Sequence, residues 1–361
     1  MRVGAGVLTM LGKGLGPRPL IVDTDGGFDD FLAVAALLAH GHDIRLVTSV
    51  FGIESAPAKT AARMRALLDK CGSQSTAVAC GAADPLGCSP GATAGCQSEW
   101  SQRMQSEVQG WANENLGADN LTAAAAAVAA ADCAFESAAA ESAAAAAPTA
   151  APTAAPTAAR DAVLRLLRGD HDHDDGAAPP DAVFDVLALG PLTNVAGFVS
   201  DWEGTGLGNV WIMGGCLDPL QGNTPHGTEF NFYHDAAAAK VVCESPEMAP
   251  RIRLVGLDAC HDRHPGFEAA STRLAASQSL IGSLQARDAH AMVYDPVVAY
   301  CATVGGAGFS FKSGALKVDA STGAVSVDVA DSAAASLVAS SFDAFDDYAV
   351  WLQAAATKAS H

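Results

Sequence analysis

Residues 19–30 read Pro-Leu-Ile-Val-Asp-Thr-Asp-Gly-Gly-Phe-Asp-Asp, and this stretch decides how the chain folds. It begins with a short apolar run that stops abruptly at polar residues and the pair Gly26-Gly27. A run of this kind predicts a β-strand that is buried on both faces. From Asp29 onward, apolar residues recur at helical spacing until Gly41, which predicts a helix that ends at that glycine.

The rest of the chain continues this alternation of strand and helix. The elements expected from spacing and composition are strands at 44–50, 183–189, 210–213 and 252–257, helices at 58–68 and 342–352, and a hairpin of strands 316–318 and 325–329. Strands that alternate with helices indicate an α/β fold in which helices flank a central, mostly parallel sheet.

One domain is predicted over residues 19–355, preceded by a flexible Gly-rich leader over residues 1–18. Residues 122–159 interrupt that domain with a low-complexity segment that is mostly alanine, and Pro-Thr-Ala-Ala repeats in it from Pro148. Such a segment has little to bury and no periodic face. We therefore expect an insertion that is helical at first, extended where the prolines fall, and outside the site.

The charge of the chain excludes some classes of partner. It has 21 Lys and Arg against 40 Asp and Glu, a formal net charge of −19. Phosphates of a nucleic acid and anionic lipid headgroups would be repelled by such a surface. No apolar run reaches the roughly 18 residues of a membrane-spanning helix. A cytoplasmic protein is expected, and the alternative is a leader that directs the chain to an organelle or to secretion.

Four carboxylates crowd the end of the first predicted strand, namely Asp23, Asp25, Asp29 and Asp30. The carboxyl ends of strands in open α/β sheets are where binding sites form. Like charges this close repel one another unless a cation or protons neutralise them. Because all the ligands offered are oxygens, the cluster predicts a site for Ca²⁺ or Mg²⁺ rather than for zinc.

Three further patterns carry polar groups in places suited to a site. The first is Gly190-Pro191-Leu192-Thr193-Asn194, a tight turn after a strand whose last carbonyls can face an ion. The second is a loop with Asn223, Glu229 and Asn231, which are hydrogen-bonding groups suited to sugar hydroxyls. The third is Tyr294-Asp295-Pro296, in which a carboxylate begins a helix.

Taken in order, these motifs resemble the nucleoside hydrolases, the inosine-uridine preferring N-glycosidases that release ribose. The motifs are Asp-Thr-Asp-Gly-Gly-Phe-Asp-Asp, Gly-Pro-Leu-Thr-Asn, Met-Gly-Gly before Gly-Asn and Glu-Phe-Asn, Val-Gly-Leu-Asp at 255–258 with His261, and Asp-Pro at 295–296. The resemblance covers roughly residues 19–355 apart from the Ala-rich segment. It implies Ca²⁺-dependent hydrolysis of ribonucleosides to ribose and a free base in purine and pyrimidine salvage, by a homodimer or homotetramer.

The same resemblance implies a role for each matching residue. Asp25 would be the general base for the attacking water. Asp30 would bind Ca²⁺ with both oxygens, assisted by Asp25, Asp295 and the backbone carbonyl of Leu189. The groups that would hold the ribose hydroxyls are Asp29, Asn223, Glu229, Asn231 and Asp295.

Three positions depart from the family pattern. The family commonly has Pro where Gly26 stands, and the exchange looks harmless because both residues suit a turn. It commonly has Asn where Ile53 stands, near the catalytic water. It commonly has His where Tyr294 stands, and a phenol there is a weaker acid for the departing base. Tyr294 is the candidate donor.

Two other functions stay open at this point. A haloacid-dehalogenase-like phosphatase also begins with a strand that ends in Asp-x-Asp, but its usual Thr or Val is replaced here by Gly27. The other alternative is a calcium-dependent ribose or nucleoside binder with weakened turnover, motivated by Ile53 and Tyr294. Release of reducing sugar from inosine or uridine separates the hydrolase from the binder.

Overall fold

The computed structural model describes residues 18–86, 99–143, 157–170, 182–260, 264–330 and 332–358. The predicted leader, except for its last residue, lies outside these ranges, and so do residues 144–156 of the Ala-rich segment and His261.

The first predicted strand, β1 (Leu20–Thr24), lies inside a nine-stranded sheet with the order β3-β2-β1-β4-β5-β6-β9-β7-β8. The other strands are β2 (Ile44–Ser49), β3 (Ala77–Cys80), β4 (Phe184–Ala188), β5 (Leu207–Met213), β6 (Ile252–Val255), β7 (Phe309–Val318), β8 (Val325–Val329) and β9 (Ser336–Phe342). In this spatial order, every neighbouring pair of strands from β3 to β9 is parallel. Strand β7 pairs antiparallel with both β8 and β9. The predicted α/β fold with a mostly parallel sheet is confirmed.

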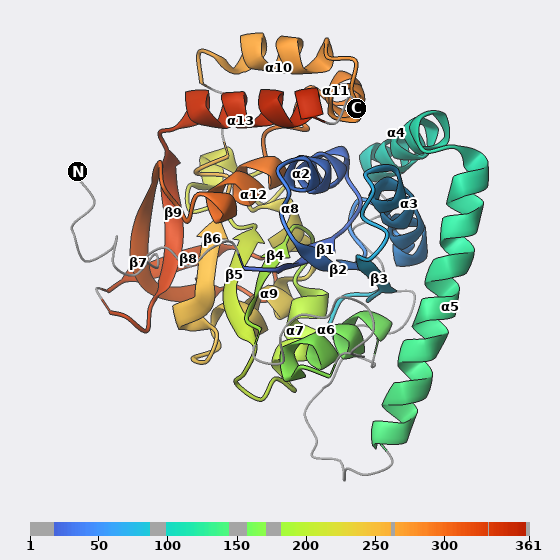
Figure 1. Ribbon diagram of the computed structural model, residues 1–361. Helices are drawn as coiled ribbons and strands as arrows, with labels where there is room; N and C mark the ends of the chain where they lie inside the picture. The colour runs from blue at the N-terminus through green and yellow to red at the C-terminus, as the bar shows by residue number, and fades with distance from the viewer. Residues whose placement is uncertain are drawn as a thin grey trace.

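Helices cover both faces of this sheet (Figure 1). One face carries α2 (Phe28–Ala39), α3 (Pro57–Lys70), α4 (Glu99–Asn115), α10 (Phe267–Ala275), α11 (Leu280–Arg287), α12 (Asp295–Thr303) and α13 (Phe345–Lys358). The other carries α6 (Ala158–Arg168), α7 (Thr193–Val199), α8 (Phe230–His234) and α9 (Ala236–Cys243). Leu20 and Val22 belong to the first core and Ile21 to the second, which explains why β1 is apolar at successive positions.

The Ala-rich segment is not simply an appendage. The long helix α5 (Ala118–Ala143) runs beside α3 at one edge of the molecule (Figure 1). Ala124 and Val128 are buried in the core, four residues apart on one face of that helix. At the far end, Ala158 and Ala159 are buried in the first turn of α6. The segment that the sequence analysis predicted to have little to bury therefore contributes small side chains to the core at both of its ends.

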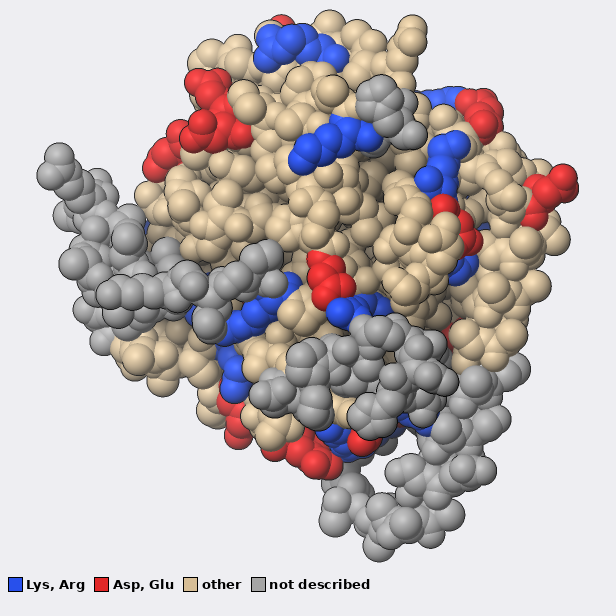
Figure 2. Space-filling view, in the orientation of Figure 1, with Lys and Arg blue, Asp and Glu red and all other residues tan. Residues whose placement is uncertain are grey.

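The surface offers little sign of a charged docking area on the side that Figure 2 displays. Acidic and basic side chains lie there in small separate groups, and no continuous basic band crosses this face. None of the helices in the described ranges combines the length and the hydropathy that a membrane span requires.

The packing of α5 leads to a stability prediction. Replacing Val128 with Ala removes buried methyl groups and should lower the free energy of unfolding by about 1–2 kcal/mol. Ala127→Ser, at an exposed position on the same helix, is the control and should change it by less than about 0.5 kcal/mol. Urea denaturation measures both values, and equal effects of the two substitutions would contradict the packing.

Candidate functional site

The first carboxylate of the acidic stretch does not belong to the cavity that the others line. Asp23 Oδ1 accepts hydrogen bonds from Thr48 Oγ1 at 2.6 Å and from Asn194 Nδ2 at 2.8 Å. The Asn194 amide also donates to the carbonyl of Ser49 and accepts from the amide of Ala82. Burial raises the pKa of Asp23 to about 7. Asp23 and Asn194 therefore tie together the ends of neighbouring strands, a structural role that the sequence analysis did not separate from the metal cluster.

The backbone turns sharply after Asp25. Gly26 has a φ of +88°, and a Cβ atom placed there would come within 2.5 Å of Thr60 Oγ1. Proline is confined to a φ near −65°, so it cannot adopt this conformation. Glycine therefore suits this turn, and a proline at the same position would need a different backbone conformation.

Asp30 lies at the start of α2 and is held by the turn itself. Its Oδ1 accepts from Thr24 Oγ1 at 2.5 Å and from the backbone amide of Asp25 at 3.2 Å. Its Oδ2 accepts from the backbone amide of Gly27 at 2.9 Å. These bonds, together with the positive end of the helix dipole, fix an acidic side chain in a buried position.

Asp29 and Asp295 bring their carboxylates to the same place. One oxygen from each of Asp29, Asp30 and Asp295 lies within 4.8 Å of the others. Asp295 begins α12, so the cluster joins two helix N-termini that are far apart in the sequence. Asp30 also interacts with the Asp25 carboxyl, which adds a fourth acidic group.

Burial of so many acids is costly without a cation. Burial raises the pKa of Asp25 and Asp295 well above the usual range, and the charge of Asp30 raises both further. Burial likewise raises the pKa of Asp29, with contributions from Asp30 and Asp288. A divalent ion would favour the charged forms instead, and an all-oxygen donor set suits Ca²⁺ or Mg²⁺. The residues present therefore fit a hard metal ion.

Opposite the acidic cluster, Glu229 caps α8. Its Oε1 accepts from the amide of Asn231 at 2.7 Å, and its Oε2 accepts from Phe232 and Gly215 at 3.0 and 3.1 Å. Burial raises the pKa of Glu229 to about 7. Asn231 Nδ2 donates to the carbonyl of Leu189 at 2.9 Å. The Leu189 carbonyl that the sequence analysis assigns to an ion is thus also an acceptor for Asn231.

A single cavity of about 390 Å³ brings these groups together. Every candidate site residue lines it: Asp25, Asp29, Asp30, Leu189, Asn223, Glu229, Asn231, Tyr294 and Asp295. Trp100 and Asp288 also line it and were not assigned to a site from the sequence. Neither residue lies in a recognised motif, and only the aromatic ring of Trp100, which could stack on a base, offered a signal.

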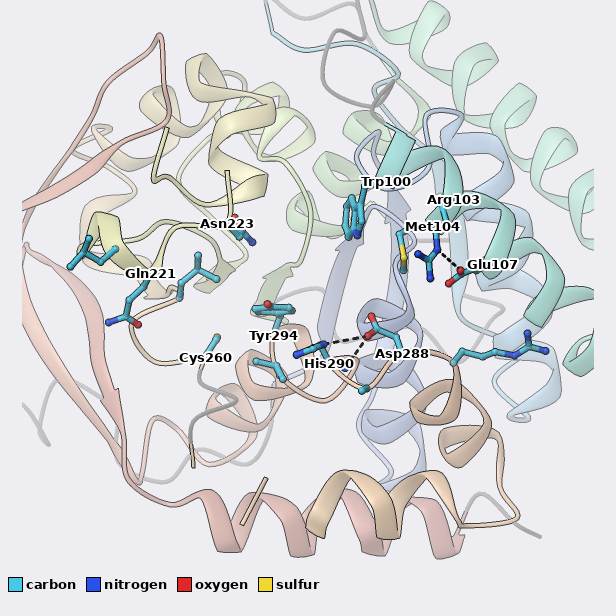
Figure 3. A pocket seen from close by; sticks show the side chains of 15 residues that line it. Trp100, Arg103, Met104, Glu107, Gln221, Asn223, Cys260, Asp288, His290 and Tyr294 are labelled. Carbon is cyan, nitrogen blue, oxygen red and sulfur yellow. Dashed lines mark hydrogen bonds and ion pairs between the residues drawn. The ribbon is translucent and has the colours of Figure 1, made fainter. Parts of the chain in front are cut away.

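A wider cavity of about 570 Å³ continues outward from the first. The two share the side chains of Trp100, Met104, Asn223, Asp288 and Tyr294. Figure 3 shows Tyr294 between Asn223 on one side and Trp100 with Met104, both from α4, on the other. The acidic floor is therefore reached through a mouth that is lined by aromatic and polar groups.

The loop after β2 holds Asp25 from behind. The amide of Ile53 donates to Asp25 Oδ2 at 3.0 Å, and the amide of Glu54 donates to the Asp25 carbonyl at 3.1 Å. Glu54 in turn forms a buried ion pair with Arg63 of α3, with Nη2 and Oε2 3.0 Å apart. Ile53 thus contributes a backbone donor to the site even though its side chain is apolar.

Comparisons with known proteins agree with this geometry. Residues 20–351 match the family model described as inosine-uridine preferring nucleoside hydrolase. No curated protein matches the chain. Neither alternative function considered from the sequence is favoured by these findings.

Solved structures of similar fold include three nucleoside hydrolases. A plant enzyme has 18% identity and a TM-score of 0.61, covering 94% of this chain and 99% of its own. A purine-preferring ribonucleoside hydrolase from Gardnerella vaginalis has 17% identity and a TM-score of 0.63, covering 95% and 99%. An inosine-guanosine nucleoside hydrolase has 18% identity and a TM-score of 0.65, covering 94% and 99%.

The ion pair behind Asp25 can be tested by stability. Arg63→Met leaves the Glu54 carboxylate buried without its partner and should lower the free energy of unfolding by about 3–5 kcal/mol. The double variant Glu54→Gln with Arg63→Met should cost less than the single one, because no charge is left buried. Lys59→Met, which removes an exposed cation near Glu54, is the control and should cost under about 1 kcal/mol. If Arg63→Met is as stable in urea denaturation as Lys59→Met, Arg63 does not compensate the buried charge of Glu54.

Proposed function

The chain belongs to the inosine-uridine preferring nucleoside hydrolase family, enzymes that act on N-glycosidic bonds, and from that premise we propose Ca²⁺-dependent hydrolysis of ribonucleosides to ribose and a free nucleobase. The observation that carries the proposal is the single cavity that all nine candidate residues line. Its acidic floor suits a cation, and its wall of amide and carboxylate groups suits a sugar. The free bases produced would serve purine and pyrimidine salvage.

The calcium site we propose consists of Asp30, Asp25, Asp295 and the backbone carbonyl of Leu189. Asp30 and Asp295 lie in the compact trio of carboxylates, and Asp25 interacts directly with Asp30. Bound Ca²⁺ would lower the pKa of a water molecule and hold it beside the substrate. The mutual repulsion of the carboxylates supports the choice of a divalent ion.

Asp25 would act as the general base. Its Oδ2 is held by the amide of Ile53, and its carbonyl is held by Glu54, so the side chain is oriented before substrate arrives. Asp25 takes a proton from the water as the water oxygen bonds to C1′ of the ribose. The bond from C1′ to the base breaks with its electron pair on the base, through an oxocarbenium-like state. Nearby carboxylates stabilise the positive charge that develops on the sugar.

The ribose would be held between the two sides of the cavity. Asp29 and Asp295 offer carboxylate acceptors from the acidic side, while Asn223, Glu229 and Asn231 face them from the loops after β5. A site whose buried charged acceptors bind hydroxyl groups discriminates strongly against substrates that lack those hydroxyls. The base would then point outward to Tyr294, the phenol at the junction of the two cavities.

Calcium-dependent turnover is the direct test of this function. Purified protein should release reducing sugar from inosine or uridine, contain about one Ca²⁺ per chain, and lose both activity and melting temperature on chelation. Because burial raises the pKa of the metal-free carboxylates, protons should begin to weaken calcium binding at a pH above the ordinary range of these groups.

Asp30→Asn should remove the ion, and Asp119→Asn, at an exposed position of α5, is the matched control. A metal-free protein with full activity would contradict calcium dependence. A protein that binds inosine without releasing sugar would instead be a binder.

The role of Glu229 leads to a second prediction. Glu229→Gln should weaken turnover of purine and pyrimidine ribosides alike, because Glu229 would contact the sugar rather than the base. Losing a charged hydrogen bond costs about 1.5–3 kcal/mol, which is roughly a tenfold to hundredfold loss in kcat/KM. 2′-Deoxyribosides should be poor substrates of the unaltered protein for the same reason.

The exposed Glu247→Gln serves as the control, and melting temperatures report any loosening of α8, which Glu229 also caps. An effect confined to one class of base would show that the assignment to ribose is wrong.

A further inference from the structure

A histidine and a carboxylate lie together at the mouth of the site, outside every motif that the sequence analysis identified. Asp288 lines both the inner and the outer cavity, and His290 lines the outer one. Figure 3 shows both side chains beside Tyr294, joined to each other by dashed lines. His290 Nδ1 lies 3.8 Å from Asp288 Oδ1, and the His290 amide donates to the same oxygen at 2.9 Å.

The loop that carries this pair is well anchored. It joins α11 to α12, so it also carries Tyr294 and leads directly into Asp295. The amide of Val293 donates to the carbonyl of His290 at 2.8 Å, and Gln285 Nε2 donates to the carbonyl of Ala289 at 2.8 Å. The His290 ring stacks near Phe267, with centroids 6.2 Å apart. The backbone of the loop at His290 is therefore held in place, and Phe267 lies beside the ring.

The arginines and the cysteine that line the outer cavity are poor proton donors. Arg103 pairs with Glu107 at 2.7 Å, and Arg287 pairs with Glu114. A guanidinium group holds its proton at any physiological pH. Burial raises the pKa of the Cys260 thiol, which keeps its proton. Imidazole, by contrast, is the side chain that most often serves as a general acid.

We propose that His290 is the general acid that protonates the departing nucleobase and that Asp288 positions its ring. This inference rests on the proposed function, because it needs a ribose on the acidic floor and a base directed outward. The side chain of His290 is 51% exposed, so solvent can restore its proton after each turnover. Tyr294, which touches both cavities, would hold the base against the donor.

The proposed step balances without any further reactant. The bond between C1′ and the base nitrogen breaks, and its electron pair stays on the base. The imidazolium N–H proton goes to a nitrogen or oxygen on the outer edge of the base. Water oxygen bonds to C1′ and gives its proton to Asp25. Solvent then removes the proton from Asp25 and returns one to His290.

The test compares a natural substrate with one whose leaving group needs no proton. His290→Gln should lower kcat on inosine by about a hundredfold or more, the contribution typical of a general acid, and leave hydrolysis of p-nitrophenyl riboside nearly unchanged. Asp288→Asn should show the same selectivity with a smaller loss. His264→Gln is the matched control, since that imidazole is also exposed and stacked on a phenylalanine, and it should change neither rate.

A second measurement separates proton donation from packing. In His290→Ala, added imidazole should partly restore inosine hydrolysis, because the outer cavity has room for it. Equal losses on both substrates, no loss on inosine, or failure of the rescue would overturn the proposal. A selective loss in Tyr294→Phe but not in His290→Gln would overturn it too and assign donation to the phenol. If the unaltered protein hydrolyses neither inosine nor uridine, the proposed function itself is wrong.

Discussion

Electrostatic repulsion among carboxylates buried at the end of β1 is the constraint on which the rest of this structure depends. Asp25, Asp29 and Asp30 come from one turn, and Asp295 joins them from α12. Acids this close in a water-poor setting need either protons or a cation, together with backbone donors aimed at them. The turn supplies those donors, since the amides of Gly27 and Ile53 bond Asp30 and Asp25. The candidate site and a source of instability are thus the same feature.

Buried polar side chains hold the loops at this edge of the sheet in place around the acidic cluster. Asn194 links the ends of three strands through Asp23, Ser49 and Ala82. On the other side of the cavity, the Glu229 carboxylate takes three backbone amides and so fixes α8 against the loop after β5. Because the side chains of Asn194 and Glu229 have their partners, they hold these loops in place without long secondary structure.

The mouth of the site is built from different elements and side chains than its floor. The floor is acidic and built from short turns, whereas the mouth combines an aromatic side chain from α4 with the loop before α12. Tyr294 lies where the two cavities meet, so a substitution there need not remove proton donation if another group nearby can supply it. Groups with the required chemistry can occupy different points on the same loop, provided that the base passes them on leaving.

Local sequence determined much of this protein. The apolar run of β1, the helical spacing after Asp29 and the hairpin near the C-terminus predicted the fold, because periodicity and turn composition act over a few residues. The same stretches placed the candidate residues that the structure brings into one cavity. Only the tertiary structure decided which acids share a site, since Asp23 is drawn away by Asn194 across a long separation in sequence. It also decided that Val128 packs, that Gly26 adopts a positive φ and that Asp288 reaches the cavity. Each of these depends on contacts between segments far apart in the chain, and neither composition nor periodicity encodes such contacts.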